Sequence, residues 1–307
     1  MQEFDDGTVY LTQEEIDNLL KQELGHGTDG RVMRFDRNRM IKLYHKYINW
    51  FKGKYHLNEE TDDDIKIYKM GDYKTRSDIF DMFSFYVSED NGEFIRIRNG
   101  AAAVASARKR QMRVKNTRLP QDAVFIDGKF IGCTLTAIKG IQIHKLIGLP
   151  FSLKKKIMKK VLYNVKELMD NYIYHIDLDN SPFTKDNYFK NEEGKMENVG
   201  HSHVLINPIT LKPQIIDLDG KSTIYTDAPS KTLEDKSMVS FNRLMLEFLL
   251  SIDLDEYKNE EDLTYVLSQI GIDVEYIDLL ASNSMNFEKT EEFLNNVNNV
   301  RTSGKSQ

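Results

Sequence analysis

The chain has 307 residues, a net charge of -6 at pH 7, 40% hydrophobic residues, 29% charged residues and one cysteine, Cys133. This composition excludes a disordered or low-complexity chain, because it holds enough apolar surface to offset the entropy lost on folding. One cysteine excludes an intramolecular disulfide and makes a cysteine-based zinc site unexpected. The acidic balance makes nucleic acid an unexpected partner. At about 150 residues per domain, the length predicts two domains or one unit with two lobes.

Membrane and export signals are not evident in the sequence. The apolar-rich stretch Phe241–Ile252 is interrupted by Arg243 and Glu247, so it falls short of the ~18 apolar residues of a membrane helix. Residues 1–7 carry three acids and no apolar run, unlike a secretory signal. We therefore expect a cytoplasmic protein with no membrane partner.

The first third of the chain alternates short β-like runs with turns. Thr12 and Glu15 have the spacing of a capping box, which predicts a short helix over Leu11–Leu20. Val32–Phe35 and Arg39–Tyr44 are predicted to be two strands around a turn.

Residues 52–95 are heterogeneous in composition, and we expect them to form an insertion. Ala101–Val114 is rich in alanine and long polar side chains, which predicts a helix that Pro120 ends. Ala123–Ile126 and Lys129–Ile138 are predicted to pair as a hairpin around Asp-Gly, the dipeptide most typical of such turns.

Beyond residue 150 the pattern becomes helical. Apolar residues recur every three or four positions over Ser152–Tyr172, which predicts a long amphipathic helix. Its early lysines are expected on a solvated face or, less often, in a patch for an acidic partner. Further helices are expected over three segments: Met238–Leu250, Asp262–Ile270 and Asn286–Val297.

A glycine-rich motif opens the chemistry-bearing part of the sequence. Gly25, Gly27, Gly30 and Val32 fit the pattern G-x-G-x-x-G-x-V. Glycines allow backbone N–H groups to approach phosphate oxygens, although they also form ordinary turns. Two β-like runs follow the motif. This arrangement favours a hairpin loop lying over phosphates rather than a Rossmann fingerprint, which needs a helix after it.

Lys42 lies 12 residues after Gly30, in the second predicted strand. A single strand lysine is commonly a solvated edge residue. In this register it can instead reach phosphates beneath the glycine loop, where a compact ammonium acts as a point charge.

Two acidic motifs follow the long helix. In Tyr174-His175-Ile176-Asp177-Leu178, Asp177 is a candidate general base and His175 a candidate brace. The alternative is an ordinary helix-ending turn.

In Ile215-Ile216-Asp217-Leu218-Asp219-Gly220, an acid ends a buried strand, where it is well placed to hold Mg²⁺. The alternative is a strand leading into an Asp-Gly turn. His203–Pro208 and Gln214–Leu218 are expected to be paired strands.

The order of these parts resembles the protein-kinase-like superfamily over residues 20–250. That resemblance implies an α+β, bilobed fold. An antiparallel sheet lobe over residues 1–136 would carry the glycine loop, the lysine and the insertion near 52–95. A mainly helical lobe over residues 137–300 would carry the catalytic and metal-binding loops, and 301–307 would be a flexible tail.

For nucleotide binding, the resemblance implies that Lys42 contacts the α- and β-phosphates of ATP. The other residues implied to bind the nucleotide are the loop residues Gly25, Gly27 and Gly30, then Val32, the gatekeeper-like Leu135, and the hinge residues Thr136 and Ile138.

For catalysis, it implies that Asp177 is the base, with Lys42 and His175 in the catalytic set. It further implies that Asp217 holds Mg²⁺, that Asp219 is an extra ligand, and that Asp235 braces the catalytic loop.

Three departures from the family pattern stand out. Pro182 replaces the asparagine expected five residues after Asp177, which leaves Asn180 or His203 as substitutes in the metal site. The helix predicted over 101–114 contains no acid to pair with Lys42: the position that the resemblance gives to a glutamate falls near Arg110 or Gln111, and Glu89 or Glu93 in the preceding segment is a candidate in its place. Asp179 stands where protein kinases place a lysine, and no A-P-E motif follows the second acidic motif.

The resemblance implies an ATP- and Mg²⁺-dependent phosphotransferase acting on a hydroxyl, with Ser or Thr of a protein as the favoured acceptor. One alternative is an aminoglycoside-phosphotransferase-like kinase with a small-molecule acceptor. Another is a nucleotide-binding pseudokinase or scaffold, and the poorest is an interaction protein with chance motifs.

Overall fold

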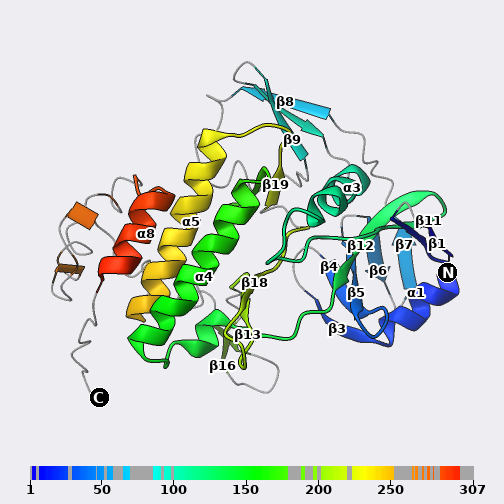
Figure 1. Cartoon of the computed structure of the whole chain (residues 1–307). Helices are drawn as coiled ribbons and strands as arrows, with labels where there is room; N and C mark the ends of the chain where they lie inside the picture. The colour runs from blue at the N-terminus through cyan, green and yellow to red at the C-terminus, as the bar shows by residue number, and fades with distance from the viewer. Residues whose placement is uncertain are drawn as a thin grey trace. The chain divides into compact units, whose positions relative to one another are not determined.

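The computed structural model (Figure 1) describes residues 2–4, 7–26, 30–45, 47–51, 54–57, 65–69, 86–90, 93–97, 100–178, 188–190, 196–198, 202–219, 223–251, 265, 267–268, 272, 275–276, 279 and 284–297. The fold is mixed α/β and divides into two compact units. Unit 1 comprises Met1–Ile138, Asp170–Ile173 and Asp217–Ser230. Unit 2 comprises Lys139–Met169, Tyr174–Ile216 and Lys231–Gln307.

Most of the strands belong to unit 1. Its elements are β1 (Gln2–Phe4), β2 (Thr8–Tyr10), α1 (Gln13–Leu20), β3 (Glu23–His26), β4 (Gly30–Arg34), β5 (Arg39–Tyr44), β6 (Ile48–Phe51), β7 (Lys54–Leu57), β8 (Ile65–Lys69), β9 (Tyr86–Asp90), β10 (Glu93–Ile97), α3 (Gly100–Gln111), β11 (Ala123–Ile126), β12 (Lys129–Thr136) and β19 (Thr223–Tyr225).

The remaining elements begin with β13 (Ile141–Gln142), a 3₁₀ turn (Ile143–Leu146), α4 (Phe151–Met169) and β14 (Ile173–His175). They continue with β15 (Tyr188–Lys190), β16 (Met196–Asn198), β17 (Val204–Ile206), β18 (Pro213–Ile215), α5 (Lys231–Leu250) and α8 (Phe287–Asn296).

A seven-stranded sheet with the order β1-β2-β11-β12-β5-β4-β3 is the framework of unit 1. Its pairs are antiparallel except β2 with β11, which is parallel. The predicted β11–β12 hairpin is confirmed, with φ of 48° at Asp127 and 75° at Gly128. Two successive positive φ angles are the geometry for which Asp-Gly is favoured.

The start of α1 follows the predicted capping box. The Glu15 backbone N–H donates to Thr12 Oγ1, and the Glu15 carboxylate accepts the Thr12 backbone N–H at 2.8 Å. Ile16 and Leu19 on this helix are buried in the core of unit 1. A hydrophobic residue at each turn of α1 therefore anchors the helix to the sheet.

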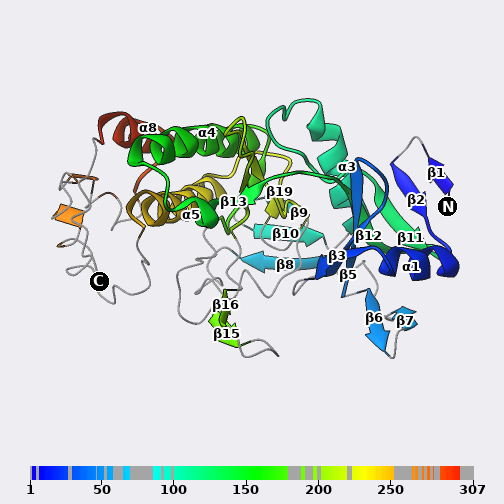
Figure 2. The same cartoon turned by 90° about the horizontal axis from the view of Figure 1, so that it is seen from below.

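The excursion between β5 and α3 is described only in part. β6 pairs with β7, and β8, β10 and β9 are antiparallel neighbours, with β8 and β10 side by side in Figure 2. β19 pairs in parallel with β9 through Tyr225 and Tyr86. The excursion thus contains strands, as a partly structured insertion would.

In unit 2, α4 packs against α5 and α8, and the three helices lie side by side (Figures 1 and 2). The predicted apolar face of α4 is buried. Four of its early lysines, Lys154, Lys155, Lys159 and Lys160, donate hydrogen bonds to residues outside the helix. Lys154, itself buried, donates to Ser251 Oγ at 2.7 Å, and Lys155 donates to the carbonyls of Asn295 and Val297 at the end of α8.

Three helix boundaries differ from the prediction by three residues or more, and one of them is the end of α4, at Met169 rather than Tyr172. α5 begins at Lys231, seven residues before the predicted start at Met238. α3 ends at Gln111 because its side chain holds the following loop: the Gln111 amide donates to the carbonyls of Val114 and Thr117 and accepts the Leu119 N–H. Of the helix predicted over 262–270, only residues 265, 267 and 268 are described, and they are helical.

No helix among the residues that the structure describes is long and apolar enough to cross a membrane.

Gly132 in β12 offers a test of how tightly β12 and β5 pack. A Cβ at this position would overlap the carbonyl oxygen of Lys42 in the neighbouring strand. We predict that Gly132→Ala lowers the free energy of unfolding by about 2 kcal/mol or more, since backbone cannot yield as a flexible side chain does. Gly148→Ala, whose Cβ would meet nothing within 4 Å, is the control. Equal urea midpoints for the two variants would contradict the described strand packing.

Candidate functional site

One row of residues runs across the sheet of unit 1 and carries several of the sequence-predicted site residues. Gly25 is paired with Val32, Val32 with Lys42, and Lys42 with Cys133. Directly paired residues in antiparallel strands project from the same face. Since side chains alternate along a strand, Tyr44 and Leu135 share this face. The sheet register therefore brings Val32, Lys42 and Leu135 together.

The structure explains the presence of glycine at one position of the motif and not at another. A Cβ at Gly30 would overlap the Leu43 carbonyl oxygen, so this glycine is required by strand packing. A Cβ at Gly25 would meet nothing within 4 Å, so packing does not explain this glycine. Gly27 lies outside the described residues. Of the two described glycines, only Gly25 leaves open space that a ligand can use.

Lys42 is buried between two carboxylates. Its Nζ lies 2.7 Å from Asp217 Oδ1 and 3.0 Å from Asp219 Oδ2. Lys42 and Asp217 are 175 residues apart in the sequence, and the Asp217–Ser230 segment belongs to unit 1 with the sheet. The structure thus brings together the strand lysine and the second acidic motif.

Tyr44, two residues after Lys42, completes the cluster. Its hydroxyl donates to Asp219 Oδ2 at 3.0 Å and lies 3.1 Å from Cys133 Sγ. Because a tyrosine hydroxyl has one proton, which Asp219 accepts, the Cys133 thiol donates to the tyrosine oxygen. The three groups form a directed chain from Cys133 to Tyr44 to Asp219.

The electrostatics of the cluster follow from burial and proximity. Burial alone would lower the pKa of Lys42, but the charges of Asp217 and Asp219 raise it well above its ordinary value. Burial raises the pKa of Asp219, and the Asp217 charge adds to this while Lys42 opposes it. Burial and the Asp219 charge also raise the pKa values of Tyr44 and Cys133. Both therefore keep their protons at neutral pH and act as donors.

The loop that carries the two acids is held by its own neighbours. Asp217 has a φ of 61°, a left-handed conformation that costs a non-glycine residue about 1 kcal/mol or more. Thr223 Oγ1 donates to the Asp217 carbonyl at 3.1 Å, and the Tyr225 hydroxyl donates to the Leu218 carbonyl at 2.7 Å. Strain of this kind is typical of functional sites.

The side chain of Arg110 joins α3 to the Asp217–Ser230 segment. Arg110 donates to the Thr226 carbonyl at 2.6 Å, and its guanidinium lies 5.7 Å from the centre of the Tyr225 ring. Arg110 is near the position where the family resemblance places a glutamate. The described acids that pair with Lys42 are instead Asp217 and Asp219, while the side chains of Glu89 and Glu93 lie outside the described residues.

The predicted hinge, Thr136–Ile138, begins at the last residue of β12. Leu135 and Ile138 are half-buried, and Thr136 Oγ1 accepts from Gln121 Nε2 at 2.8 Å. The backbone N–H of Ala137 donates to the Asn38 carbonyl at 2.7 Å. This segment is therefore tied to the turn between β4 and β5.

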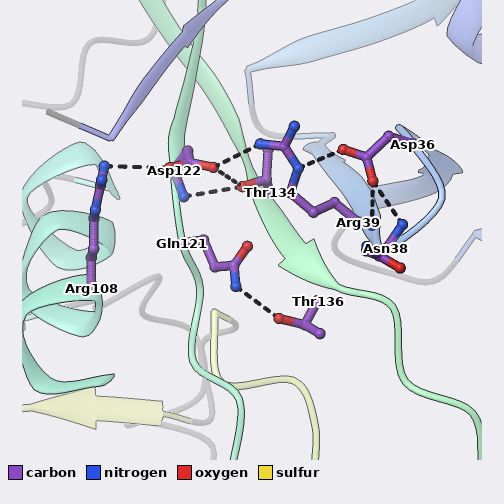
Figure 3. A network of polar contacts seen from close by, with 8 residues as sticks. All are labelled: Asp36, Asn38, Arg39, Arg108, Gln121, Asp122, Thr134 and Thr136. Atoms are coloured by element: carbon purple, nitrogen blue, oxygen red, sulfur yellow. Dashed lines mark hydrogen bonds and ion pairs between the residues drawn. The ribbon is translucent and has the colours of Figure 1, made fainter. Parts of the chain in front are cut away.

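A polar network supports that end of the sheet (Figure 3). The Asp122 carboxylate forms ion pairs with Arg39 of β5 and Arg108 of α3, each at 3.4 Å. It also accepts a hydrogen bond from Thr134 Oγ1 at 2.7 Å. Arg39 also bonds Asp36 at 2.6 Å. Burial alone would raise the pKa of Asp36, but hydrogen bonds from Asn38 and Arg39 lower it below its ordinary value. The network joins β5, β12 and α3.

The first acidic motif, Tyr174–Leu178, lies in unit 2, and Asp179 and Asn180, which follow it, are outside the described residues. His175 is buried, and its Nδ1 accepts the Asp177 backbone N–H at 3.2 Å. The other ring nitrogen, Nε2, is 3.2 Å from the Ile216 carbonyl. Since Nδ1 accepts, Nε2 carries the proton and donates. His175 thus joins the backbone beside Asp177 to the residue that precedes Asp217.

His203 and Ser240 hold the rest of this loop. His203 Nδ1 donates to the Asp177 carbonyl, and its ring lies 5.1 Å from the ring of His175. The Leu178 N–H donates to Ser240 Oγ at 2.6 Å.

The bracing role predicted for Asp235 is wrong, because Asp235 lies within α5, half-exposed, and pairs with Lys231 at 2.8 Å. Ser240, one helical turn and a half further on, contacts the loop instead.

The carboxylate oxygens of Asp217 and Asp219 in unit 1 are ligands of the kind that Mg²⁺ prefers. No group of three or more His, Cys, Asp or Glu side chains within the described ranges is arranged to hold a metal ion by itself. Mg²⁺, however, is typically bound by one or two carboxylates together with substrate phosphates and water. Oxygens of Asp217 and Asp219 already converge on one cation, the Lys42 ammonium.

Sequence reasoning did not find Tyr44, Cys133 or Ser240. Tyr44 and Cys133 carry a detectable signal, since each is on the same sheet face as Lys42 once the strand pairing is assumed. Ser240 carries none, because no local pattern of a serine inside a helix indicates that its hydroxyl will accept a hydrogen bond from a distant loop.

Removal of the Lys42 charge tests the electrostatics of the cluster. A raised lysine pKa contributes stability that is fully present below the unfolded value of about 10.4 and is lost as pH rises through the folded pKa. We predict that Lys42→Met lowers the free energy of unfolding by about 3 kcal/mol at pH 7, since it leaves a buried carboxylate unpaired.

The pH dependence distinguishes this cause from lost packing. In Lys42→Met the pKa of Asp219 is expected to rise further, so the variant should lose stability as pH rises from 4 toward 8. The double variant Lys42→Met/Asp219→Asn should recover part of the loss. A difference from the parent that is the same at pH 4.5 and pH 8, measured by urea unfolding, would show that the ion pairs are unimportant.

Comparison by sequence finds no match. None of the protein-family models matches the chain, and no curated protein matches it. Among solved structures, the chain is similar to the kinase PK-1 of Cydia pomonella granulovirus, with a TM-score of 0.43 and 12% identity over 92% of this chain and 98% of that chain. A similarity at this level assigns neither a family nor an activity to this chain.

Proposed function

We propose that this chain is a kinase-like phosphotransferase that binds ATP and transfers its γ-phosphoryl group to a hydroxyl. The observation that carries the proposal is the Lys42–Asp217–Asp219 cluster. A buried ammonium held between two carboxylates, one of them on strained backbone, supplies both charges that a metal-bound triphosphate needs. The sequence motifs that contain these residues occur in the order found in the protein-kinase-like superfamily, whose bilobed fold is part of the proposal.

In this proposal, unit 1 binds the nucleotide. The Lys42 ammonium would contact the α- and β-phosphates, and Gly25 would leave room above them, because a Cβ at this position meets no atom of the described residues within 4 Å. Gly27, outside the described residues, would lie in the same loop. Leu135, Thr136 and Ile138 would bind the adenine, with the backbone there held by the turn before β5.

Asp217 would hold Mg²⁺, and the family resemblance of the sequence also implies Asp219 and Asn180 as ligands. The bound ion would neutralise charge on the transferring phosphoryl group. Asp217 is the better placed of the two described acids, because its side chain is 20% exposed while that of Asp219 is 1% exposed.

Asp177 would accept the proton of the acceptor hydroxyl. Its side chain is partly exposed, as a general base must be, while its backbone N–H and carbonyl are held by His175 and His203. Positioning of this kind is the main contribution of a protein to phosphoryl transfer, since little covalent chemistry falls to it. His175 therefore acts as a positioning residue.

The favoured acceptor is Ser or Thr of a protein, as the glycine loop of the sequence indicates. Asp179, where protein kinases place a lysine, favours the second candidate, a small-molecule kinase. A pseudokinase or scaffold would have no need to keep Lys42, Asp177 and Asp217 together.

Transfer from γ-labelled ATP tests the proposal. Purified protein would be incubated with Mg²⁺ and the label, alone, with a cell lysate and with a metabolite extract. We predict label transfer that falls by about 100-fold or more in Asp177→Asn, as expected on removal of a general base. Asp217→Asn should show a similar loss, and Asp127→Asn, a matched change in an exposed hairpin turn, should not.

Each outcome has a distinct meaning. Label on protein identifies a protein acceptor, and label confined to the metabolite extract identifies a small-molecule acceptor. Equal transfer by the parent and Asp177→Asn removes the catalytic role of Asp177. An absence of transfer with Mg-ATP still bound supports the pseudokinase, and an absence of binding overturns the proposal.

A further inference from the structure

A lysine that contacts phosphates needs an acid that orients it and stays with it when the metal arrives. α3 supplies no acid for this purpose, because Gly100–Gln111 contains neither Asp nor Glu. α3 is instead joined to the Thr226 carbonyl through Arg110. Within the described part of unit 1, the acids on Lys42 are Asp217 and Asp219.

These two acids differ in environment. The Asp219 side chain is 1% exposed, and its Oδ2 accepts both the Lys42 ammonium at 3.0 Å and the Tyr44 hydroxyl at 3.0 Å. The Asp217 side chain is 20% exposed and contacts Lys42 through Oδ1 at 2.7 Å. A hard cation that keeps several waters needs an accessible carboxylate, which Asp217 offers and Asp219 does not.

Tyr44 secures Asp219 from the strand that carries Lys42. Positions 42 and 44 of β5 project from one face of the sheet. The Tyr44 hydroxyl receives the Cys133 thiol proton and points its own proton at Asp219. Rotation of Asp219 away from Lys42 would break the hydrogen bond that its carboxylate accepts from the buried Tyr44 hydroxyl, and a buried hydrogen bond to a charged group is costly to lose.

From this geometry we infer that Asp219 is a positioning residue, which Tyr44 holds in place as the permanent anchor of Lys42, and that it is not a second metal ligand. Of the two acids, only Asp217 releases the Lys42 ammonium and binds the metal in its place. The inference rests on the proposed function for its consequence in ATP binding. The anchoring arrangement itself does not depend on that function.

ATP affinity measured in Mg²⁺ and again in EDTA separates an anchor from a metal ligand. Loss of one hydrogen bond to a charged group is expected to weaken ATP binding by about tenfold in Tyr44→Phe. For Tyr44→Phe and for Asp219→Asn, the fall in ATP affinity should be the same in Mg²⁺ and in EDTA, because the anchor acts on Lys42 and not on the metal. In Asp217→Asn the affinity should fall in Mg²⁺ and change little in EDTA.

Tyr47→Phe is the matched control, since Tyr47 is buried and its ring packs on Tyr44. It should bind ATP as the parent does. If Asp219→Asn abolishes the advantage of Mg²⁺ as Asp217→Asn does, Asp219 is a metal ligand and the inference is overturned. Tyr44→Phe binding equal to that of the parent would overturn the role of Tyr44.

A second measurement needs no nucleotide. Acetylation of Lys42 by an amine-reactive ester, followed by peptide mass spectrometry, reports how firmly the ammonium is held. Its rate should rise by about threefold or more in Tyr44→Phe and Asp219→Asn relative to Tyr47→Phe. Equal rates would overturn the anchor even if the parent binds no ATP, whereas a parent that binds no ATP but shows the rise contradicts only the proposed function.

Discussion

The ammonium of Lys42 between the carboxylates of Asp217 and Asp219 is the interaction on which the rest of unit 1 depends. A buried lysine without a partner would lose its charge or unfold its surroundings. The two acids come from a segment 175 residues away, so the pair joins distant parts of the chain at one face of the sheet. The strained backbone at Asp217 persists because Thr223 and Lys42 both hold that residue.

Strand packing, rather than a helix, positions this cluster. Gly132 and Gly30 allow β12 and β4 to approach β5 on either side, which fixes the register that places Cys133 and Val32 beside Lys42. α3 contributes through cations: Arg110 reaches the Thr226 carbonyl, and Arg108 reaches the Asp122 network of Figure 3. Two of the three basic residues in the last turn of α3 therefore hold the helix to neighbouring parts of unit 1.

Local signals in the sequence predicted most of the elements near the site. The Thr12 capping box, the Asp127-Gly128 turn and the period of α4 each depend on a few neighbouring residues, and each is present. The cluster was predicted only as separate motifs. The acids that pair with Lys42 depend on long-range packing, which residue spacing does not encode. The residue that contacts the Asp177 loop is Ser240 rather than Asp235, because α5 begins earlier than its apolar pattern indicates and so includes Asp235.

The decisive measurement is a crystal structure with Mg²⁺ and a non-hydrolysable ATP analogue. We predict that Lys42 leaves Asp217 for phosphate oxygens and keeps its contact with Asp219, whose carboxylate still accepts the Tyr44 hydroxyl. Asp217 would then contact the metal. A nucleotide bound elsewhere, or a Lys42 that remains on both carboxylates with the analogue in place, would show that Lys42 does not exchange Asp217 for phosphate.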